Sequence, residues 1–475
     1  MFGIKLETNS GVSLTRQLCE QLRTLIQLGK MTGNERLPST RKLAGELGVS
    51  RNIVIDVYEQ LIAEGYLESR TGSGTYVTWN LEQGEPVYDR NTWQSIPVSV
   101  SNDSKRDIIE FAYGTPELRM FPRNSWSRCL KNAIMDINEE YLDYDDIFGF
   151  FELRSVLSEY LLRTKGIRCD EEQIIIVSGS SEGFVLCAKV FLEICNSIYI
   201  EDPSVEFTKD IFKMMGYKIN CLEVDSNGAR PESLQKEKEV KLALLTPSHQ
   251  FPTGSILPIK RRLQMIEIAE KNSAFIIEDD YDSEFRFKGL PIQPLQVLSP
   301  SRVIYTGTFS KNMAPSLRLG YLIVPRELIS RFKRVKVRLN MRTSTIEQKA
   351  MAEFIRTGCL ERHIYRMKNI YSKRRAFLSS MVREYYGNNA AILGDEAGMH
   401  IKVEFMQQAF NYIDWHKSIE YGVEIDSIEN FCIHKGNNRN KIILGYGNLD
   451  MQEIEEGVKR LYRFTSSYLK QYYNV

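Results

Sequence analysis

Residues 306–320 hold the side chains whose types and spacing point most directly to chemistry. Lys311 follows an apolar run, residues 303–305, that we expect to form a strand. The ε-amine of a lysine at a strand end can form a Schiff base with an aldehyde cofactor. Two hydroxyl residues and an arginine near this lysine can hold a phosphate beside it: Thr308, Ser310 and Arg318.

A second candidate phosphate site lies where a predicted strand passes into a helix. Residues 174–177 read Ile-Ile-Ile-Val, and Gly179, Ser180 and Ser181 follow them. Backbone N–H groups and hydroxyls at the start of a helix can bind a phosphate. Similar turns also serve only as helix caps, so this turn alone is weak evidence.

A third strand end carries the acidic run Glu-Asp-Asp-Tyr-Asp at residues 278–282. We expect Asp279 to lie against the ring nitrogen of a pyridine cofactor, where a buried carboxylate keeps that nitrogen protonated. Tyr281, two positions later, would face the same side and hydrogen-bond the phenolic oxygen of the ring. Alone, this run would be interpreted as a solvated loop. Its place between a Pro-Thr-Gly loop, residues 252–254, and Lys311 favours the cofactor site.

The elements that must position these residues are those of an α/β domain over residues 108–475. Apolar runs of strand length alternate there with longer amphipathic segments. In such folds, ligands bind at the carboxyl edge of the sheet, where the strand ends meet. Residues 79–107 are polar with little periodicity, which is typical of a linker between two independently folded units.

Composition limits the remaining possibilities. The 475 residues suffice for two or three domains, and 43% apolar with 26% charged residues is ordinary for a soluble protein. A net charge of +1 means that any DNA affinity must come from locally placed arginines. No apolar run could span a bilayer and no signal peptide is evident, so we expect a cytoplasmic protein without a membrane partner. The eight cysteines form no C-x-x-C pair, so we expect reduced thiols and no metal site.

Residues 1–78 have the pattern of a helix-turn-helix. Apolar residues at three- and four-residue steps predict one amphipathic helix near residues 14–26. Ser39 or Thr40 can cap a second helix, Gly48 supplies a tight turn, and Ser50 can cap a third. The start of this third helix is the end that would meet base edges in the major groove.

The candidate DNA contacts follow from this arrangement. Arg51 can pair with a guanine and Asn52 with an adenine, while Arg41 is placed for phosphates. Residues 71–74 predict the turn of a hairpin, a wing that can lie in the minor groove. On charge alone, a small helical cap with solvated arginines remains the alternative. The full candidate set is Arg36, Ser39, Thr40, Arg41, Ser50, Arg51, Asn52, Gly72 and Ser73.

Several motifs resemble one known family over nearly the whole chain. The segments LPSTRKLAGELGVSRN, EGYLESR and GSGTYV are similar to the GntR-type winged helix, and HQFPTG, IEDDYDSEF, GTFSKNMAPSLR and AGMH to the MocR/GabR subfamily of these regulators. The resemblance implies a winged helix-turn-helix domain (1–78), a linker (79–107) and a fold-type I aminotransferase-like domain (108–475) that binds pyridoxal 5'-phosphate.

The resemblance also implies the partners of the protein. These are double-stranded operator DNA, a small amine or amino-acid effector, and a second copy of the chain in a head-to-tail, domain-swapped homodimer. In such dimers a tyrosine from the partner often reaches the phosphate, and Tyr144 is the candidate.

The chain departs from the family pattern where an effector would lie. A family member that senses a carboxylate-bearing amine has an aromatic residue and two arginines where Val205, Phe207 and Asn430 stand here. None of these three can clamp a carboxylate with two hydrogen bonds as arginine does. We therefore expect an effector that is less acidic or differently shaped, unless Arg439 or Lys441 compensates.

Two more residues are unusual for the family. Ile53 stands where threonine is commoner, which puts one DNA contact in doubt. Glu182 lies beside the predicted phosphate turn, where its charge is unfavourable unless the side chain turns away.

These features favour a cofactor-dependent transcriptional regulator. Lys311 would hold the cofactor as an internal aldimine, and an incoming amine would displace the lysine and change the geometry of the domain. Pyridoxal phosphate itself is an alternative signal. A catalytically active aminotransferase with a DNA-binding head is the competing function, and a repressor whose body has lost the cofactor and only dimerises is a third.

Overall fold

The computed structural model describes residues 3–7, 11–78, 107–143, 146–235, 240–289, 292–340 and 342–473. The chain divides into two compact units, residues 1–102 and 103–475, which are described separately. Apart from Asp107, the predicted linker lies outside the described residues. The domain boundaries at residues 78 and 108 therefore stay predictions.

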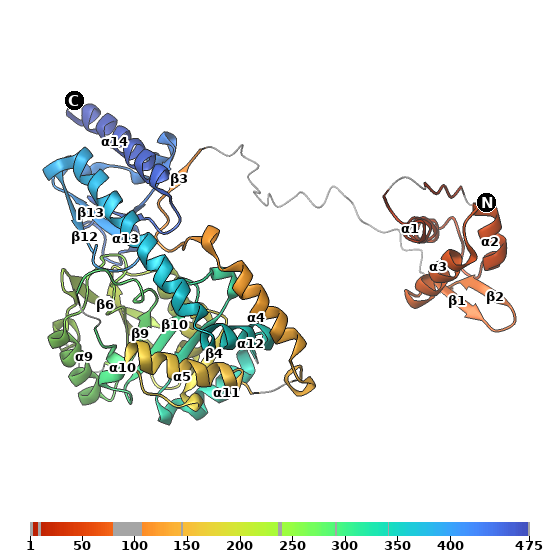
Figure 1. The fold of residues 1–475 in the computed structure, drawn as a ribbon, viewed down its shortest axis with the longest axis horizontal. Helices are drawn as coiled ribbons and strands as arrows, with labels where there is room; N and C mark the ends of the chain where they lie inside the picture. Colours follow the sequence, from red (N-terminus) through yellow and green to blue (C-terminus); the bar gives the residue numbers. More distant parts are fainter. Residues whose placement is uncertain are drawn as a thin grey trace. The chain divides into compact units, whose positions relative to one another are not determined.

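The N-terminal unit contains three helices, α1 (Leu14–Gln27), α2 (Thr40–Leu47) and α3 (Arg51–Ala63) (Figure 1). The predicted apolar face of α1 is confirmed, because Leu18, Leu22 and Ile26 are buried against the other helices. Gly48 ends α2 with φ +67°, a left-handed conformation that glycine adopts without strain. It thus makes the turn that was expected between α2 and α3.

A two-stranded hairpin completes this unit. Strand β1 (Leu67–Arg70) pairs antiparallel with β2 (Gly74–Val77). The intervening turn lies at residues 71–73, as the glycine-rich run predicts. Leu67 and Val77 are buried in the same core as the helices, so the hairpin packs as the wing of a winged helix.

The C-terminal unit is built on an eight-stranded sheet with the order β4-β11-β10-β9-β8-β5-β6-β7. Strands β5, β6, β8, β9 and β10 pair in parallel, and β11 (Gly320–Ile323) runs antiparallel between β10 and β4. The remaining bounds are β4 (Ile174–Val177), β5 (Ser197–Asp202), β6 (Lys218–Asp225), β7 (Gly228–Ala229), β8 (Leu242–Leu245), β9 (Phe275–Asp280) and β10 (Val303–Thr308).

The predicted strands are confirmed, with one extension. Strand β9 continues through Asp280, so Glu278 and Asp280 point away from the face that Asp279 occupies. Both faces of the sheet are covered by apolar clusters, which explains the continuous apolar runs. The helices of this unit are α4 (Arg123–Met135), α5 (Phe151–Lys165), α6 (Ser180–Phe191), α7 (Glu206–Met214), α8 (Glu232–Gln235), α9 (Ile259–Asn272), α10 (Leu295–Leu298), α11 (Ile329–Leu339) and α12 (Thr345–Arg356).

A smaller layer stands beside this sheet in the same unit. It contains the antiparallel sheet β12-β13-β16-β15 and a short parallel pair of β14 with β3. The long helix α13 (Cys359–Tyr386) contacts both α12 and α14 (Met451–Tyr473), so it joins the two layers (Figure 1). The strands are β3 (Ile109–Glu110), β12 (Ala390–Leu393), β13 (His400–Phe405), β14 (Val423–Glu424), β15 (Asp426–Ser427) and β16 (Lys441–Gly445).

No helix in the described ranges has both the length and the apolar character that a membrane crossing requires.

Candidate functional site

Lys311 lies just beyond the carboxyl end of β10. Its Nζ donates a hydrogen bond to the carbonyl oxygen of Gly114 at 2.7 Å. Burial lowers the pKa of this amine, while Asp282 and Asp279 act in the opposite direction. A lowered pKa favours the neutral, nucleophilic form of the amine, which is the form that reacts with an aldehyde.

Asp279 lies on β9, directly beside β10 in the parallel register. Burial and the neighbouring Asp280 raise the pKa of its carboxyl to about 7. Among the described residues, none donates a hydrogen bond to this carboxylate. Because a desolvated carboxylate without a donor is costly, a protonated ring nitrogen would supply what the site lacks. This residue therefore fits the role that the sequence predicts for it.

A buried group of side chains near Lys311 was not singled out from the sequence. His249 Nδ1 lies 3.0 Å from Asp282 Oδ2, and the ring of His400 lies 4.6 Å from that of His249. Potential ligand atoms of these three residues lie within 4.8 Å of one another. Tyr281 joins the group, since its hydroxyl donates to the carbonyl oxygen of His249 at 2.9 Å. The HQFPTG and AGMH motifs contain both histidines, so a signal for them was present.

The predicted phosphate turn and Arg318 lie together. Arg318 Nη2 donates to the carbonyl oxygen of Ser178 at 2.5 Å. Gly179 has φ +86°, and a Cβ there would come within 3.0 Å of the Arg318 guanidinium. Ser180 and Ser181 are the first residues of α6, so their N–H groups lack partners within the helix. The turn thus combines a cation with free donors, which suits a phosphate.

The charge of Glu182 at this turn is compensated by two donors. Its Oε1 accepts a hydrogen bond from the buried Lys336 Nζ at 2.9 Å. Its Oε2 accepts from the backbone nitrogen of Ser178 at 2.5 Å. The ion pair neutralises the carboxylate, so Glu182 does not oppose an anion at the turn.

Thr308 and Ser310 belong to the segment that leads from β10 to Lys311. Thr308 is buried at the end of β10, and its Oγ1 accepts a hydrogen bond from the backbone nitrogen of Ser310 at 3.1 Å. This bond shapes the backbone that leads into Lys311. Tyr144 lies outside the described residues, so its role stays a prediction.

Asp279 leads to a pH-dependent prediction for the protein without cofactor. In the unfolded chain its carboxyl ionises near pH 3.8, whereas the folded protein holds the proton to about pH 7. Stability is therefore lost as the pH rises through this window. We expect Asp279→Asn to raise the Tm by about 2–4 °C at pH 8, with a gain that grows between pH 5 and pH 7 and then levels off.

The same substitution should weaken cofactor binding in a spectroscopic titration, although it stabilises the apo-protein. Calorimetry of Asp210→Asn, an exposed carboxylate on α7, provides the control and should show no such gain. A pH-independent Tm difference for Asp279→Asn would contradict the assignment.

In the N-terminal unit, the two predicted caps are in place. Ser39 Oγ accepts from the backbone nitrogen of Lys42 at 3.3 Å, and Ser50 Oγ accepts from that of Ile53 at 3.4 Å. Ser39 rather than Thr40 is therefore the N-cap of α2. Both serines serve the fold, whatever else they contact.

The candidate base-reading residues Arg51 and Asn52 lie at the exposed start of α3. Arg51 is the first residue of α3, and its Nε donates to Thr40 Oγ1 at 3.3 Å. No described residue bonds its two terminal nitrogens, so these can face a base edge. Arg36 lies against the wing, with its Nε 3.1 Å from the position of a Cβ at Gly74. Also exposed are Arg41, Asn52, Gly72 and Ser73.

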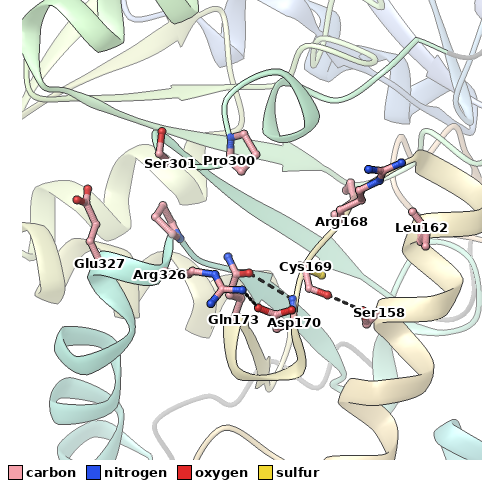
Figure 2. Close-up of a pocket in the computed structure, with 12 residues that line it drawn as sticks. Ser158, Leu162, Arg168, Cys169, Asp170, Gln173, Pro300, Ser301, Arg326 and Glu327 are labelled. Atoms are coloured by element: carbon pink, nitrogen blue, oxygen red, sulfur yellow. Dashed lines mark hydrogen bonds and ion pairs between the residues drawn. The ribbon is translucent and has the colours of Figure 1, made fainter.

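A cavity of about 620 Å³ lies at the opposite edge of the large sheet, where the parallel strands begin (Figure 2). Gln173 and Ser301, which precede β4 and β10, contribute to its lining. Its polar groups bond one another: Asp170 pairs with Arg326, and Ser158 Oγ donates to the carbonyl oxygen of Cys169 at 2.6 Å. This cavity is therefore separate from the site around Lys311.

Comparison with known proteins supports both units. Residues 14–77 match the family model "Bacterial regulatory proteins, gntR family", and residues 107–431 match "Aminotransferase class I and II". The "Probable rhizopine catabolism regulatory protein MocR" of Rhizobium meliloti is 33% identical over 96% of this chain and 94% of its own length. This chain belongs to the MocR/GabR subfamily of GntR-type transcriptional regulators.

Other members and solved structures agree with this membership. The "HTH-type pyridoxine biosynthesis transcriptional regulator PdxR" of Corynebacterium glutamicum is 32% identical over 84% of each chain. The kynurenine aminotransferase of Pyrococcus horikoshii, solved with PMP, has a TM-score of 0.71 and 27% identity over 77% of this chain and 92% of its own. The MocR/GabR-type body thus has the fold of fold-type I aminotransferases, as predicted.

The three residues of this MocR/GabR-type regulator that depart from the family pattern lie close together in space. Val205, Phe207 and Asn430 all line one cavity of about 440 Å³. Arg439 and Lys441, the proposed substitutes for the missing arginines, do not line it. Arg439 instead lies 3.9 Å from Glu429, and Lys441 Nζ donates to Asn438 Oδ1 at 2.9 Å. The described residues therefore give no support to compensation by either cation.

Proposed function

We propose that this regulator binds pyridoxal 5'-phosphate at Lys311 and double-stranded operator DNA through its winged helix, and senses a small amine or amino acid. The observation that carries this proposal is the presence, at the ends of adjacent strands, of a desolvated lysine and of a carboxylate that accepts no hydrogen bond. Lys311 has a lowered pKa, and Asp279 on the adjacent strand has a raised one. A neutral amine at Lys311 could react with the aldehyde of a cofactor, and the carboxylate of Asp279 could accept a hydrogen bond from its protonated ring nitrogen.

The residues that would hold the cofactor have separate tasks. Asp279 would bind the ring nitrogen, Arg318 and the turn at Gly179 would bind the phosphate, and Tyr281 would contact the ring oxygen. When bound, the cofactor supplies an aldehyde carbon that reacts reversibly with primary amines. Lys311 would supply the amine that an effector must displace, and the carbonyl oxygen of Gly114 would accept a hydrogen bond from the freed lysine, as it does in this structure.

Sensing requires that the domain adopt one geometry when Lys311 holds the cofactor and another when an effector amine has taken its place. A ligand shifts an equilibrium only through its differential affinity for two states. Gly114 leads from β3 into α4, so a change in its contact with Lys311 reaches the segment that connects the two layers of this unit. We propose that a homodimer, head-to-tail as in the family pattern, converts this change into a different presentation of its two winged helices.

The test combines a spectrum and a DNA-binding measurement on the full-length protein. Added cofactor should produce a visible absorbance band, an effector amine should shift this band, and the same amine should change the operator affinity. A cofactor band without any amine-dependent change in DNA binding would leave a cofactor-binding protein that is not a sensor.

Catalytic turnover is the second candidate function, because the solved structures of similar fold are aminotransferases. It would require Lys311 to move protons on bound substrate repeatedly. With a second keto acid added to regenerate the aldehyde form of the cofactor, release of keto acid from the amino acid over many cycles would favour the enzyme. A single stoichiometric exchange favours the regulator.

A further inference from the structure

The cavity of about 440 Å³ that contains the departures from the family pattern is lined by the residue next to Gly114, the contact of Lys311. Gly114 accepts the hydrogen bond from Lys311 Nζ at 2.7 Å, and Tyr113 lines the cavity. Tyr113 is thus the lining residue that directly precedes the carbonyl group contacted by Lys311. The lining of this cavity then decides which effectors fit.

One wall of the cavity is aromatic. The ring of Tyr113 lies 4.8 Å from that of Phe251 and 5.4 Å from that of Phe431. Phe207, which is 45% exposed, contributes a further ring. Aromatic surfaces of this kind pack against methylene chains and attract cations over their faces.

Two carboxylates stand around the same wall. Glu206 opens α7, and Asp426 lies on β15. Both act on the hydroxyl of Tyr113, where they add to burial in raising its pKa. Neither carboxylate has a hydrogen-bond or ion-pair partner in the described part of the chain. Burial and the neighbouring Glu424 also raise the pKa of Asp426, while His416, which lines the same cavity, acts in the opposite direction.

The two lysines near the cavity donate hydrogen bonds to backbone carbonyl oxygens. Lys209 Nζ donates to the carbonyl oxygen of Phe431 at 2.6 Å and is buried beneath the wall. Lys435 lines the cavity, but its Nζ donates to the carbonyl oxygens of Glu429 and Asn430 at 2.7 Å and 3.1 Å. These hydrogen bonds hold both lysines against the backbone of the wall, although Lys209 also interacts with the charge of Glu206.

We infer that the effector is an amine whose far end carries a second positive charge, as in a linear diamine. One amine would take the place of Lys311, and the other would lie against Tyr113 between Glu206 and Asp426. The absence of arginines at residues 207 and 430 agrees with this chemistry, because a cationic end needs anions where a carboxylate end needs arginines. The inference rests on the proposed function, since it assumes amine binding at Lys311.

The test uses the full-length protein with bound cofactor and follows its visible spectrum. The probes are 1,4-diaminobutane, 1,5-diaminopentane, n-butylamine and an ω-amino acid of matched length. We expect at least one diamine to shift the spectrum at a concentration about 10-fold or more below that of n-butylamine, with the amino acid weakest. Added salt should reduce this preference.

Single substitutions show which carboxylates cause the preference for a diamine over n-butylamine. Asp426→Asn and Glu206→Gln should each reduce the advantage of the diamine over n-butylamine by about 5-fold, while Asp210→Asn, further along α7, should not. Equal binding of diamine and n-butylamine, or tighter binding of the amino acid, would overturn the inference alone. A spectrum that no amine shifts would overturn the proposed sensing function and the inference with it.

Discussion

Lys311→Ala is expected to abolish covalent attachment of pyridoxal phosphate. The variant should lose the visible band of the lysine-bound cofactor, and borohydride reduction followed by mass spectrometry should find no adduct. Non-covalent binding through Asp279 and Arg318 should persist but weaken, because the covalent bond and its proximity advantage are gone. The amine-dependent change in operator affinity should disappear with the band.

Lys333→Ala provides the matched control for this experiment. Lys333 is an exposed lysine on α11 in the same unit, and its loss should leave the band, the adduct and the DNA response unchanged. An adduct on another lysine in Lys311→Ala would show that the cofactor is held elsewhere. A full DNA response in that variant would show that sensing does not pass through this amine.

Arg51→Ala is expected to weaken specific operator binding by about 1–3 kcal/mol, or roughly 5- to 150-fold in Kd. Arg51 begins α3 and is held by Thr40 through Nε alone, which leaves its terminal nitrogens for a base edge. Thr40→Val should produce a smaller loss, since it removes only the group that orients the guanidinium. Electrophoretic mobility shift or fluorescence anisotropy with operator and scrambled DNA measures both.

Arg41→Ala separates base reading from phosphate contact in the same assay. Arg41 is exposed on α2, so its loss should lower affinity for operator and scrambled DNA alike and reduce the salt slope by about 1. Arg16→Ala is the control, because Arg16 on α1 is paired with Glu20 at 2.9 Å. Unchanged binding in both Arg51→Ala and Arg41→Ala would mean that another surface reads the DNA.

Local features were largely predictable from the sequence. The capping serines, the turn at Gly48, the wing and the buried strands each depend on residues close together in the chain, and these are where propensity and periodicity carry information. The acidic strand end shows the limit of that information. Its extension through Asp280 could not be inferred, because Glu278 and Asp280 are buried polar residues that break the apolar pattern.

The environment of each candidate group was decided by contacts between distant segments. Glu182 was predicted as an unfavourable charge, and only the packing of α11 against α6 shows that Lys336 neutralises it. The pairing of Asp282 with His249 likewise joins two strand ends, and His400 reaches them from the smaller layer. No local pattern encodes such partners.

By itself, the sequence indicated that a winged helix precedes an aminotransferase-like body, and that Lys311 and Asp279 stand at strand ends; that these two strands are neighbours is seen only in the sheet. Only the tertiary structure decided which charges remain unpaired around them. The physical reason is that charge and desolvation depend on distance in space. Gly114 and Lys311, or Tyr113 and Phe431, come together only when the whole chain has folded.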